Sequence, residues 1–248
     1  MADPFEKRLR RAEFLQKEWP FAADLLCFYR KIFALQSDLY RDLSAGAYPD
    51  ATPLVPHMQR LLDLVSREGP PEIAHRAGSI PLGPLLVRYS DGESLEDPVL
   101  EFFPRVLQAA ELAWMSDHRP PPTARESQRE CPGCGKLPLV GLLREDKAAE
   151  TVRRTLICSL CAHEWDFARV LCPACGEEKP EKLPRYSAQE IPWMRIEGCD
   201  TCGKYLKSVD LTLNWDAEPV VDELASTPLD VIAGEHGYAK IAPNLAGL

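Results

Sequence analysis

Residues 131–135 read CPGCG, residues 158–162 CSLCA, residues 172–176 CPACG and residues 199–203 CDTCG. These four Cys-x-x-Cys turns contain eight of the nine cysteines in the 248-residue chain. Twenty-three residues lie between Cys134 and Cys158, and 23 lie between Cys175 and Cys199. The first two turns are repeated 41 residues later by the third and fourth turns. In a reducing compartment, such closely spaced pairs indicate bound metal rather than a disulfide framework.

Each Cys-x-x-Cys turn can direct two sulfurs toward one metal ion, and two turns complete a tetrahedral site of four thiolates. A glycine after the second cysteine, as at Gly135, Gly176 and Gly203, lets the chain leave the turn with a positive φ. A crossed pairing of the turns would be compatible with the spacing. Sequence order and the equal gaps favour two sequential sites instead, the first made of Cys131, Cys134, Cys158 and Cys161 and the second of Cys172, Cys175, Cys199 and Cys202.

The eight cysteines predict two metal ions per chain, and both iron and zinc accept four thiolates in a tetrahedron. A closed site leaves no coordination position for a substrate, so neither metal would act as a Lewis acid there. Iron could cycle by one electron, whereas zinc could not. His163, two residues after Cys161, is the alternative to one thiolate of the first site.

Charge limits the partners that the chain can bind. Lys and Arg number 29 against 38 Asp and Glu, which gives a formal charge of −9, and two tetrathiolate sites would lower it to about −13. So acidic a protein lacks the basic surface that a general grip on nucleic acid or on anionic lipid requires. No run approaches the roughly 20 apolar residues of a membrane span, and the segment after Arg10–Arg11 is too polar for an export signal. We therefore expect a cytoplasmic protein without membrane insertion.

The first part of the chain has helical periodicity. Apolar residues recur every three or four positions over 21–44 and 52–67, and a third helix is predicted to begin at 97–98. Pro120–Pro122 cannot continue a helix and favour an extended spacer. The sequence thus predicts an α+β protein with a helical domain over 1–123 and a double four-cysteine metal-ribbon domain over 124–248.

The second domain is predicted to consist of two tandem modules, each rubredoxin-like or of the zinc-ribbon kind. In 205–213, Tyr205 and Val209 alternate with Ser208 and Asp210, the period of a half-buried strand. With few large apolar residues, this domain depends on metal for part of its stability. The expected elements are strands at 139–143, 151–157, 165–170, 193–196 and 205–213, followed by short helices at 220–225 and 228–235 in a tail that closes the domain.

Other candidate functional residues give weaker signals. Cys27 lies between apolar neighbours in the first predicted helix, which favours a buried, inert thiol. Arg153–Arg154 and Lys204 with Lys207 form two small positive spots, explained either by solvated strand faces or by docking of an acidic peptide. No arrangement of the histidines suggests a catalytic triad and no glycine-rich phosphate loop is present, so we expect no enzyme.

The ordered series of turns, together with CSLCAHEW at 158–165 and CDTCGKYLK at 199–207, resembles the formate dehydrogenase accessory protein family, FdhE. The likeness continues in the tail, at ASTPLD over 225–230 and EHGY over 235–238. It covers about half of the chain specifically and is consistent with a helical first half.

The resemblance implies a cytoplasmic assembly factor. Members of this family are thought to bind the catalytic subunit of formate dehydrogenase and to assist its maturation before export by the twin-arginine route. They are associated with rubredoxin-like iron, so the eight paired cysteines here would hold iron or zinc, while Cys27 acquires no role. The alternatives are a rubredoxin-like electron carrier and, less favoured by the charge, a nucleic-acid-binding zinc ribbon.

Overall fold

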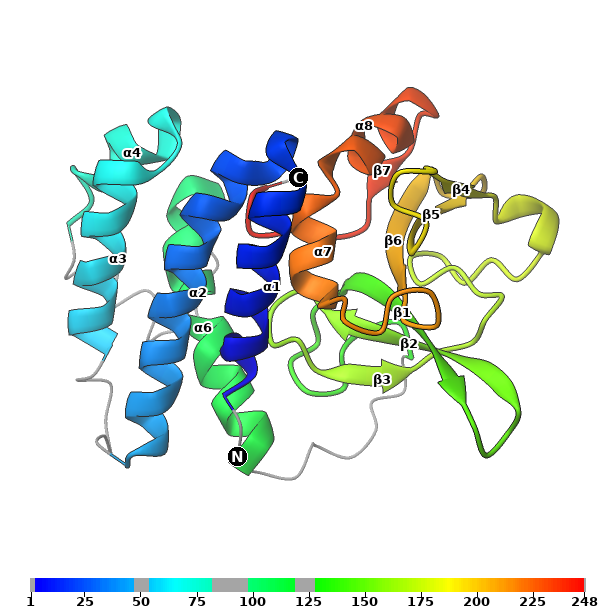
Figure 1. The fold of residues 1–248 in the computed structure, drawn as a ribbon, viewed down its shortest axis with the longest axis horizontal. Coiled ribbons are helices and arrows are strands. Elements are labelled where there is room, and N and C mark those ends of the chain that lie inside the picture. The colour runs from blue at the N-terminus through cyan, green and yellow to red at the C-terminus, as the bar shows by residue number, and fades with distance from the viewer. Residues whose placement is uncertain (1–2, 47–53, 82–97, 119–127, 248) are drawn as a thin grey trace. The chain divides into compact units, whose positions relative to one another are not determined.

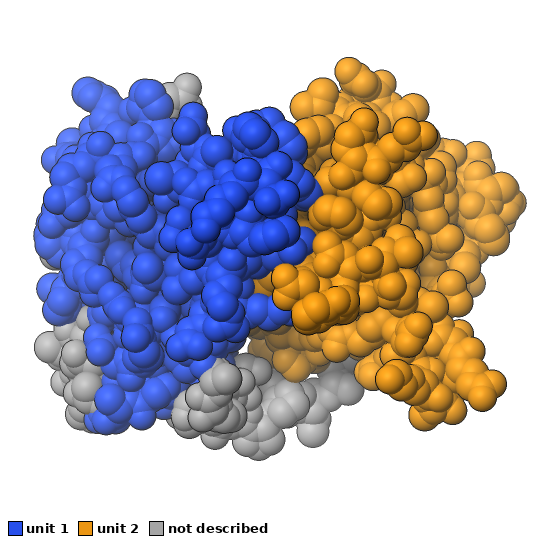
Figure 2. All heavy atoms as spheres, viewed as in Figure 1, with its two compact units in different colours: residues 1–119 blue, residues 120–248 orange. Residues whose placement is uncertain are grey.

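The computed structural model describes residues 3–46, 54–81, 98–118 and 128–247. It divides the chain into two compact units, residues 1–119 and 120–248, drawn in blue and orange in Figure 2. The predicted domain boundary at 123/124 lies outside the described residues. Each unit is described separately below.

Unit 1 is a helical bundle in its described part (Figure 1). Packing contacts link α2 to α1, α3 and α6, so α2 is the central helix of the bundle. A 3-10 turn, Pro20–Ala22, separates α1 from α2. The helices are α1 (Pro4–Glu18), α2 (Ala23–Ser44), α3 (Leu54–Glu68), α4 (Pro71–Ala77) and α6 (Pro98–His118).

The core of unit 1 comes from the apolar stripes of its helices. The predicted helices at 21–44 and 52–67 correspond to α2 and α3, which begin two residues later, and the third corresponds to α6. The side chains of Phe33, Met58 and Phe103 are fully buried. Burying side chains of this size supplies about 1.5–3 kcal/mol each. None of the described helices combines the length and the apolar content of a membrane span.

The predicted burial of Cys27 is wrong. Its thiol was expected to be buried, but the residue is exposed. The buried face of α2 runs through Leu26, Tyr29 and Phe33, and Cys27 shares the opposite face with the exposed Lys31. Apolar neighbours in sequence do not place a helical residue in the core, because adjacent residues point about 100° apart around the axis.

Unit 2 is built on one seven-stranded sheet in the order β3-β2-β1-β6-β5-β4, with β7 also pairing with β6. The first module supplies β3-β2-β1 and the second β6-β5-β4, each antiparallel. The parallel pairing of β1 with β6 joins the two modules into a continuous sheet. The strands are β1 (Pro138–Asp146), β2 (Thr151–Cys158), β3 (Glu164–Asp166), β4 (Arg185–Ser187), β5 (Met194–Cys199), β6 (Lys204–Asp210) and β7 (Ala239–Lys240).

The predicted half-buried alternation in β6 is wrong. Every residue from Tyr205 to Val209 is buried, because β6 is an interior strand flanked by β1 and β5. The strand ends at Asp210, whose carboxylate accepts the Thr212 backbone N–H at 3.0 Å in a turn. β3 is likewise shorter than predicted and ends at Asp166, and the short strands β4 and β7 were not predicted.

The tail forms α7 (Pro219–Ala225) and α8 (Thr227–Glu235), close to the predicted helices. Both pack on the sheet, α7 on β1 and β6 and α8 on β5 and β7. A buried network of charges fixes them there. The Lys207 ammonium on β6 lies 2.7 Å from Asp230 Oδ2 and 3.1 Å from Glu223 Oε1, and Lys240 pairs with both carboxylates.

Two of the cations that were interpreted as solvated strand faces or a docking spot are buried instead. Lys207 is 0% exposed and Arg154 is 3% exposed. Arg154 donates to Glu197 Oε2 at 2.6 Å, whereas its neighbour Arg153 is exposed and pairs with Asp166. Period-2 patterns do not reveal such residues because a buried charge with a partner looks, in sequence, like a solvated one.

Candidate metal centres

The first cysteine group joins the turn before β1 to the turn between β2 and β3. The Sγ atoms of Cys131 and Cys161 lie 3.6 Å apart, and those of Cys134 and Cys158 lie 3.3 Å apart. All four sulfurs are within 4.8 Å of one another. The antiparallel β1–β2 hairpin positions the group, since it brings the chain back beside its own starting turn.

The second group repeats this arrangement in the second module. The Sγ atoms of Cys172 and Cys202 lie 3.8 Å apart, and those of Cys175 and Cys199 lie 3.7 Å apart. These four sulfurs also lie within 4.8 Å of one another. The structure thus brings together the two sequential sets that the equal spacing favours, and not the crossed sets.

Three of the four cysteine turns share a backbone hydrogen bond, and all four end on a residue with positive φ. The N–H of the residue after the second cysteine donates to the carbonyl of the first in the turns ending at Gly135, Gly176 and Gly203, each at 2.9 Å. These glycines have φ of 76°, 83° and 64°, as the sequence analysis predicted. In the remaining turn Ala162 takes this place with φ 55°. A side chain in this conformation costs about 1 kcal/mol.

Ala162→Gly is expected to stabilise unit 2 by about 0.5–1 kcal/mol. Glycine relieves the strain of the left-handed conformation, and this effect exceeds the destabilisation caused by the greater conformational entropy of glycine in the unfolded chain. The measurement is urea unfolding of the metal-loaded chain. Gly176→Ala is the matched reverse change and should destabilise the unit by a similar amount. A loss of stability in Ala162→Gly would contradict this reading of the turn.

The sulfur spacing fits a tetrahedral metal ion and not disulfides. A disulfide requires about 2.0 Å between sulfurs, and all nine cysteines are free. Four sulfurs at about 2.3 Å from a central zinc ion lie about 3.8 Å apart, close to the 3.3–3.8 Å found between the pairs above. Each group can therefore hold one metal ion, and the donor set alone does not select iron or zinc.

Four clustered thiols cannot all ionise without a cation. In the first group, hydrogen bonding with Cys131 and Cys134, followed by burial, raises the pKa of the Cys158 and Cys161 thiols. In the second group, burial is the main cause that raises the pKa of Cys172 and Cys202. A divalent ion reverses this preference, because thiolates are its ligands and binding releases their protons.

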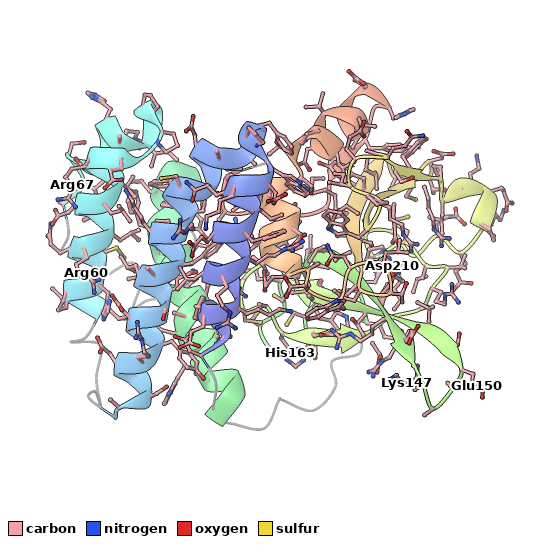
Figure 3. All side chains as sticks on the ribbon, viewed as in Figure 1. Arg60, Arg67, Lys147, Glu150, His163 and Asp210 are labelled. Carbon is pink, nitrogen blue, oxygen red and sulfur yellow. The ribbon has the colours of Figure 1, made fainter. Side chains whose placement is uncertain are left out.

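His163 belongs to neither group of sulfurs. Its carbonyl accepts the backbone N–H of Cys158 at 3.0 Å, so the residue helps to shape the turn through its main chain. Figure 3 labels it beside the strands of the first module. With four cysteines already together, the alternative ligand set containing His163 is not the one that the structure assembles.

The two groups differ in exposure. In the first, three cysteines are buried and Cys134 is half-buried, whereas in the second Cys175 is exposed and Cys202 half-buried. Solvent and reagents therefore reach the second group more easily.

In the metal-loaded chain, a limiting thiol-alkylating reagent is expected to modify Cys175 several-fold faster than Cys134, because reactivity follows access to the sulfur. Peptide mapping by mass spectrometry measures both rates. The exposed Cys27, outside both groups, serves as the internal reference for the activity of the reagent. Faster modification of Cys134 than of Cys175 would contradict the order inferred from burial.

Family models match the whole of the cysteine-rich region. Residues 130–169 match the model described as FdhE, central domain, and residues 170–246 match FdhE, C-terminal domain. The boundary between the two models falls between the two cysteine groups, although the sheet runs across it.

Several curated relatives named "Protein FdhE homolog" are similar to the chain. The protein from Stutzerimonas stutzeri is 35% identical over 62% of this chain and 50% of its own length. The Pseudomonas aeruginosa relative is 39% identical over 48% of this chain and 40% of its own length. The chain thus spans about half the length of these two relatives. The Aquifex aeolicus relative is 28% identical over 80% of this chain and 71% of its own length.

A solved structure extends the likeness to nearly all of the chain. The crystal structure of the FdhE protein from Pseudomonas aeruginosa covers 98% of this chain and 95% of its own, with a TM-score of 0.71 and 25% identity. Family models, relatives and fold agree with the motif series and with a helical region followed by the sheet that carries both cysteine groups. Over its cysteine-rich region, residues 130–246, the chain matches the FdhE family, and its fold is similar to that of a solved FdhE protein.

Proposed function

We propose that this chain is a cytoplasmic assembly factor that binds the immature catalytic subunit of a formate dehydrogenase and assists its maturation before export. It does so as a binding protein and not as an enzyme. The observation that carries the proposal is the presence of two complete four-cysteine groups in a region that matches the FdhE family models.

The geometry of the groups favours a binding role. Each gathers four sulfurs, so a tetrahedral ion held there has no position left for a reactant. The ligands come from turns at the ends of strands in one continuous sheet, so holding metal also holds the shape of that sheet. A surface maintained in this way suits recognition of another protein.

Iron or zinc would be held by Cys131, Cys134, Cys158 and Cys161 in the first group and by Cys172, Cys175, Cys199 and Cys202 in the second. Iron in such a site transfers one electron at a time, and zinc does not. The protein's own part is to keep the thiolates apart at tetrahedral spacing and to exclude competing ligands.

Affinity capture with the tagged, metal-loaded chain tests the proposal in cells that make a formate dehydrogenase. The catalytic subunit, identified by mass spectrometry, should co-purify with the wild type and with Cys27→Ser. Cys158→Ser, which opens the first group, should reduce capture at least tenfold. Absence of the subunit from a wild-type sample whose metal content has been verified would overturn the proposal.

A rubredoxin-like electron carrier is the second candidate, and the exposure of Cys175 favours it because electron transfer requires a site near the surface. An optical spectrum of protein purified without oxygen and then oxidised tests this function. Visible thiolate-to-iron absorption that returns through repeated oxidation and reduction supports a carrier. A colourless, zinc-containing protein excludes it.

A further inference from the structure

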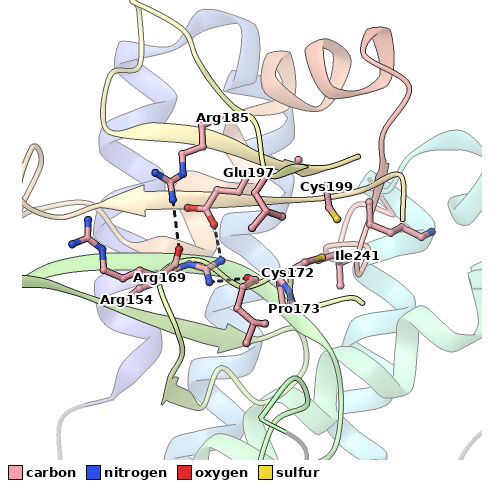
Figure 4. A pocket seen from close by; sticks show the side chains of 12 residues that line it. Arg154, Arg169, Cys172, Pro173, Arg185, Glu197, Cys199 and Ile241 are labelled. Carbon is pink, nitrogen blue, oxygen red and sulfur yellow. Dashed lines mark hydrogen bonds and ion pairs between the residues drawn. The ribbon is translucent and has the colours of Figure 1, made fainter. Parts of the chain in front are cut away.

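Unit 2 contains a pocket of about 340 Å³, including the solvent at its mouth, beside the second cysteine group (Figure 4). Cys172 and Cys199 form part of its wall. The remaining lining comes from both modules and from the tail, between Arg154 on β2 and Ile241 after β7. Because these segments are distant in sequence, the pocket exists only in the folded unit.

The lining of the pocket is basic, although the whole chain has a formal charge of −9. Four cationic side chains line the pocket, whereas only one carboxylate does, that of Glu197. Figure 4 shows three guanidinium groups on the side of the pocket where Glu197 lies, away from the labelled sulfurs. The cations are Arg154, Arg169, Arg185 and Lys204.

Glu197 is already neutralised by two buried or half-buried arginines. Its Oε2 accepts from Arg154 at 2.6 Å, and its Oε1 accepts from Arg195 at 2.6 Å. Burial opposes its ionisation, but these two guanidinium groups hold the pKa of Glu197 below its usual range. The single carboxylate of the pocket therefore has no capacity left to balance the other cations.

The remaining three cations are exposed, and among the described residues none of them pairs with a carboxylate within 4.0 Å. Arg185 donates at 3.5 Å to the carbonyl of Arg169, which leaves the charge of both guanidinium groups unbalanced. Lys204, the first residue of β6, also lines the pocket. Three unpaired cations around one hollow form a site for more than one negative charge.

Apolar side chains complete the wall, among them Leu171, Leu183 and Ile241. A free inorganic anion would use the cations alone, whereas a peptide can place carboxylates on the cations and an aliphatic side chain on this surface. We propose that the pocket binds an acidic peptide segment of a partner protein. The proposal goes beyond the assembly role above and does not depend on which protein carries the segment.

The competing explanation is that the cations only offset the negative charge of the neighbouring thiolates. That explanation predicts an effect of the arginines on metal retention and no preference for a peptide. The two explanations therefore differ in measurable ways.

Fluorescence anisotropy with the full-length, metal-loaded chain tests the proposal. The probe is a fluorescein-labelled peptide, Leu-Glu-Asp-Glu-Asp-Leu, and its control is the amide form, Leu-Gln-Asn-Gln-Asn-Leu. The acidic peptide should bind at least tenfold more tightly, with an affinity that falls as salt is raised. Acetate at equal carboxylate concentration should not displace it.

Arg169→Gln with Arg185→Gln should weaken binding of the acidic peptide about tenfold or more, since each charge-assisted hydrogen bond is lost. The matched control, Lys147→Gln with Lys179→Gln, removes two exposed cations outside the pocket and should change the affinity less than twofold. Figure 3 shows Lys147 at the tip of the β1–β2 hairpin. Arg169→Lys with Arg185→Lys, which retains both charges, should bind within about threefold of the wild type.

Metal content per chain is measured for every variant. Peptide selectivity in the wild type, lost in the glutamine pair and kept in the lysine pair, supports the proposal. Failure of the wild type to prefer the acidic peptide, displacement by acetate, or equal weakening by the control pair overturns it. The proposal is also overturned if the glutamine pair loses metal and the wild type does not prefer the acidic peptide. That result would show that the cations offset the charge of the thiolates.

Discussion

Removal of metal is expected to unfold unit 2 while the helices of unit 1 persist. Structural tetrathiolate zinc sites bind with about 10–16 kcal/mol, which exceeds the few kcal/mol that a small domain gains from its core alone. Trp165 and Trp193 are half-buried in unit 2, so their fluorescence should shift toward that of solvent-exposed tryptophan when a strong chelator is added under reducing conditions. Circular dichroism at 222 nm should fall only in part, because unit 1 carries the long helices α2 and α6.

Restoring one divalent ion per cysteine group should reverse the change. As a control for direct effects of the chelator, the same treatment of Cys27→Ser should give the same curves, because Cys27 belongs to neither group. A metal-free chain that keeps the tryptophan spectrum and thermal transition of the loaded protein would show that the sheet does not depend on the cysteine groups.

Lys207→Met is expected to destabilise the metal-loaded protein by about 3–5 kcal/mol. The methionine fits the volume but leaves Glu223, fully buried, and Asp230, largely buried, with Lys240 as their remaining ammonium partner. Breaking one side of a buried ion network costs this much because the remaining charge stays desolvated. Urea unfolding followed by tryptophan fluorescence measures the difference in the free energy of unfolding.

Lys204→Met provides the matched control, since Lys204 lies three residues earlier on the same strand and is exposed. This change should alter stability by less than about 0.5 kcal/mol. Equal losses in the two variants would mean that β6 is sensitive to any lysine substitution, and the network would not be the anchor of α7 and α8.

The composition of the cysteine groups was predictable because it depends on local geometry. Two residues between cysteines set the turn, and equal gaps of 23 residues give each module its own pair of turns. The glycines after the turns follow from the same local requirement for a positive φ. No local pattern, however, reveals the parallel pairing of β1 with β6, in which Val140 lies opposite Lys207. Without that pairing, β6 was interpreted as a half-buried strand.

Helix α1 was missed for a physical reason. Its buried face includes Arg8 and Arg11 among apolar residues, which breaks the apolar periodicity. The guanidinium groups lie 4.9 Å from the ring centre of Phe5 and 5.2 Å from that of Phe14, so the aromatic rings cover the charged side chains. Only Arg154 and Lys204 of the four pocket cations belonged to the predicted positive spots, because the four come from separate segments of the chain.

Metal counting by native mass spectrometry tests the central claim most directly, that eight cysteines form two separate and complete metal sites. The intact wild-type chain should carry two metal ions, Cys158→Ser should lose the ion of the first group, and Cys199→Ser should lose that of the second. One ion in the wild type, or a mass that shows cysteines joined as disulfides, would contradict the account.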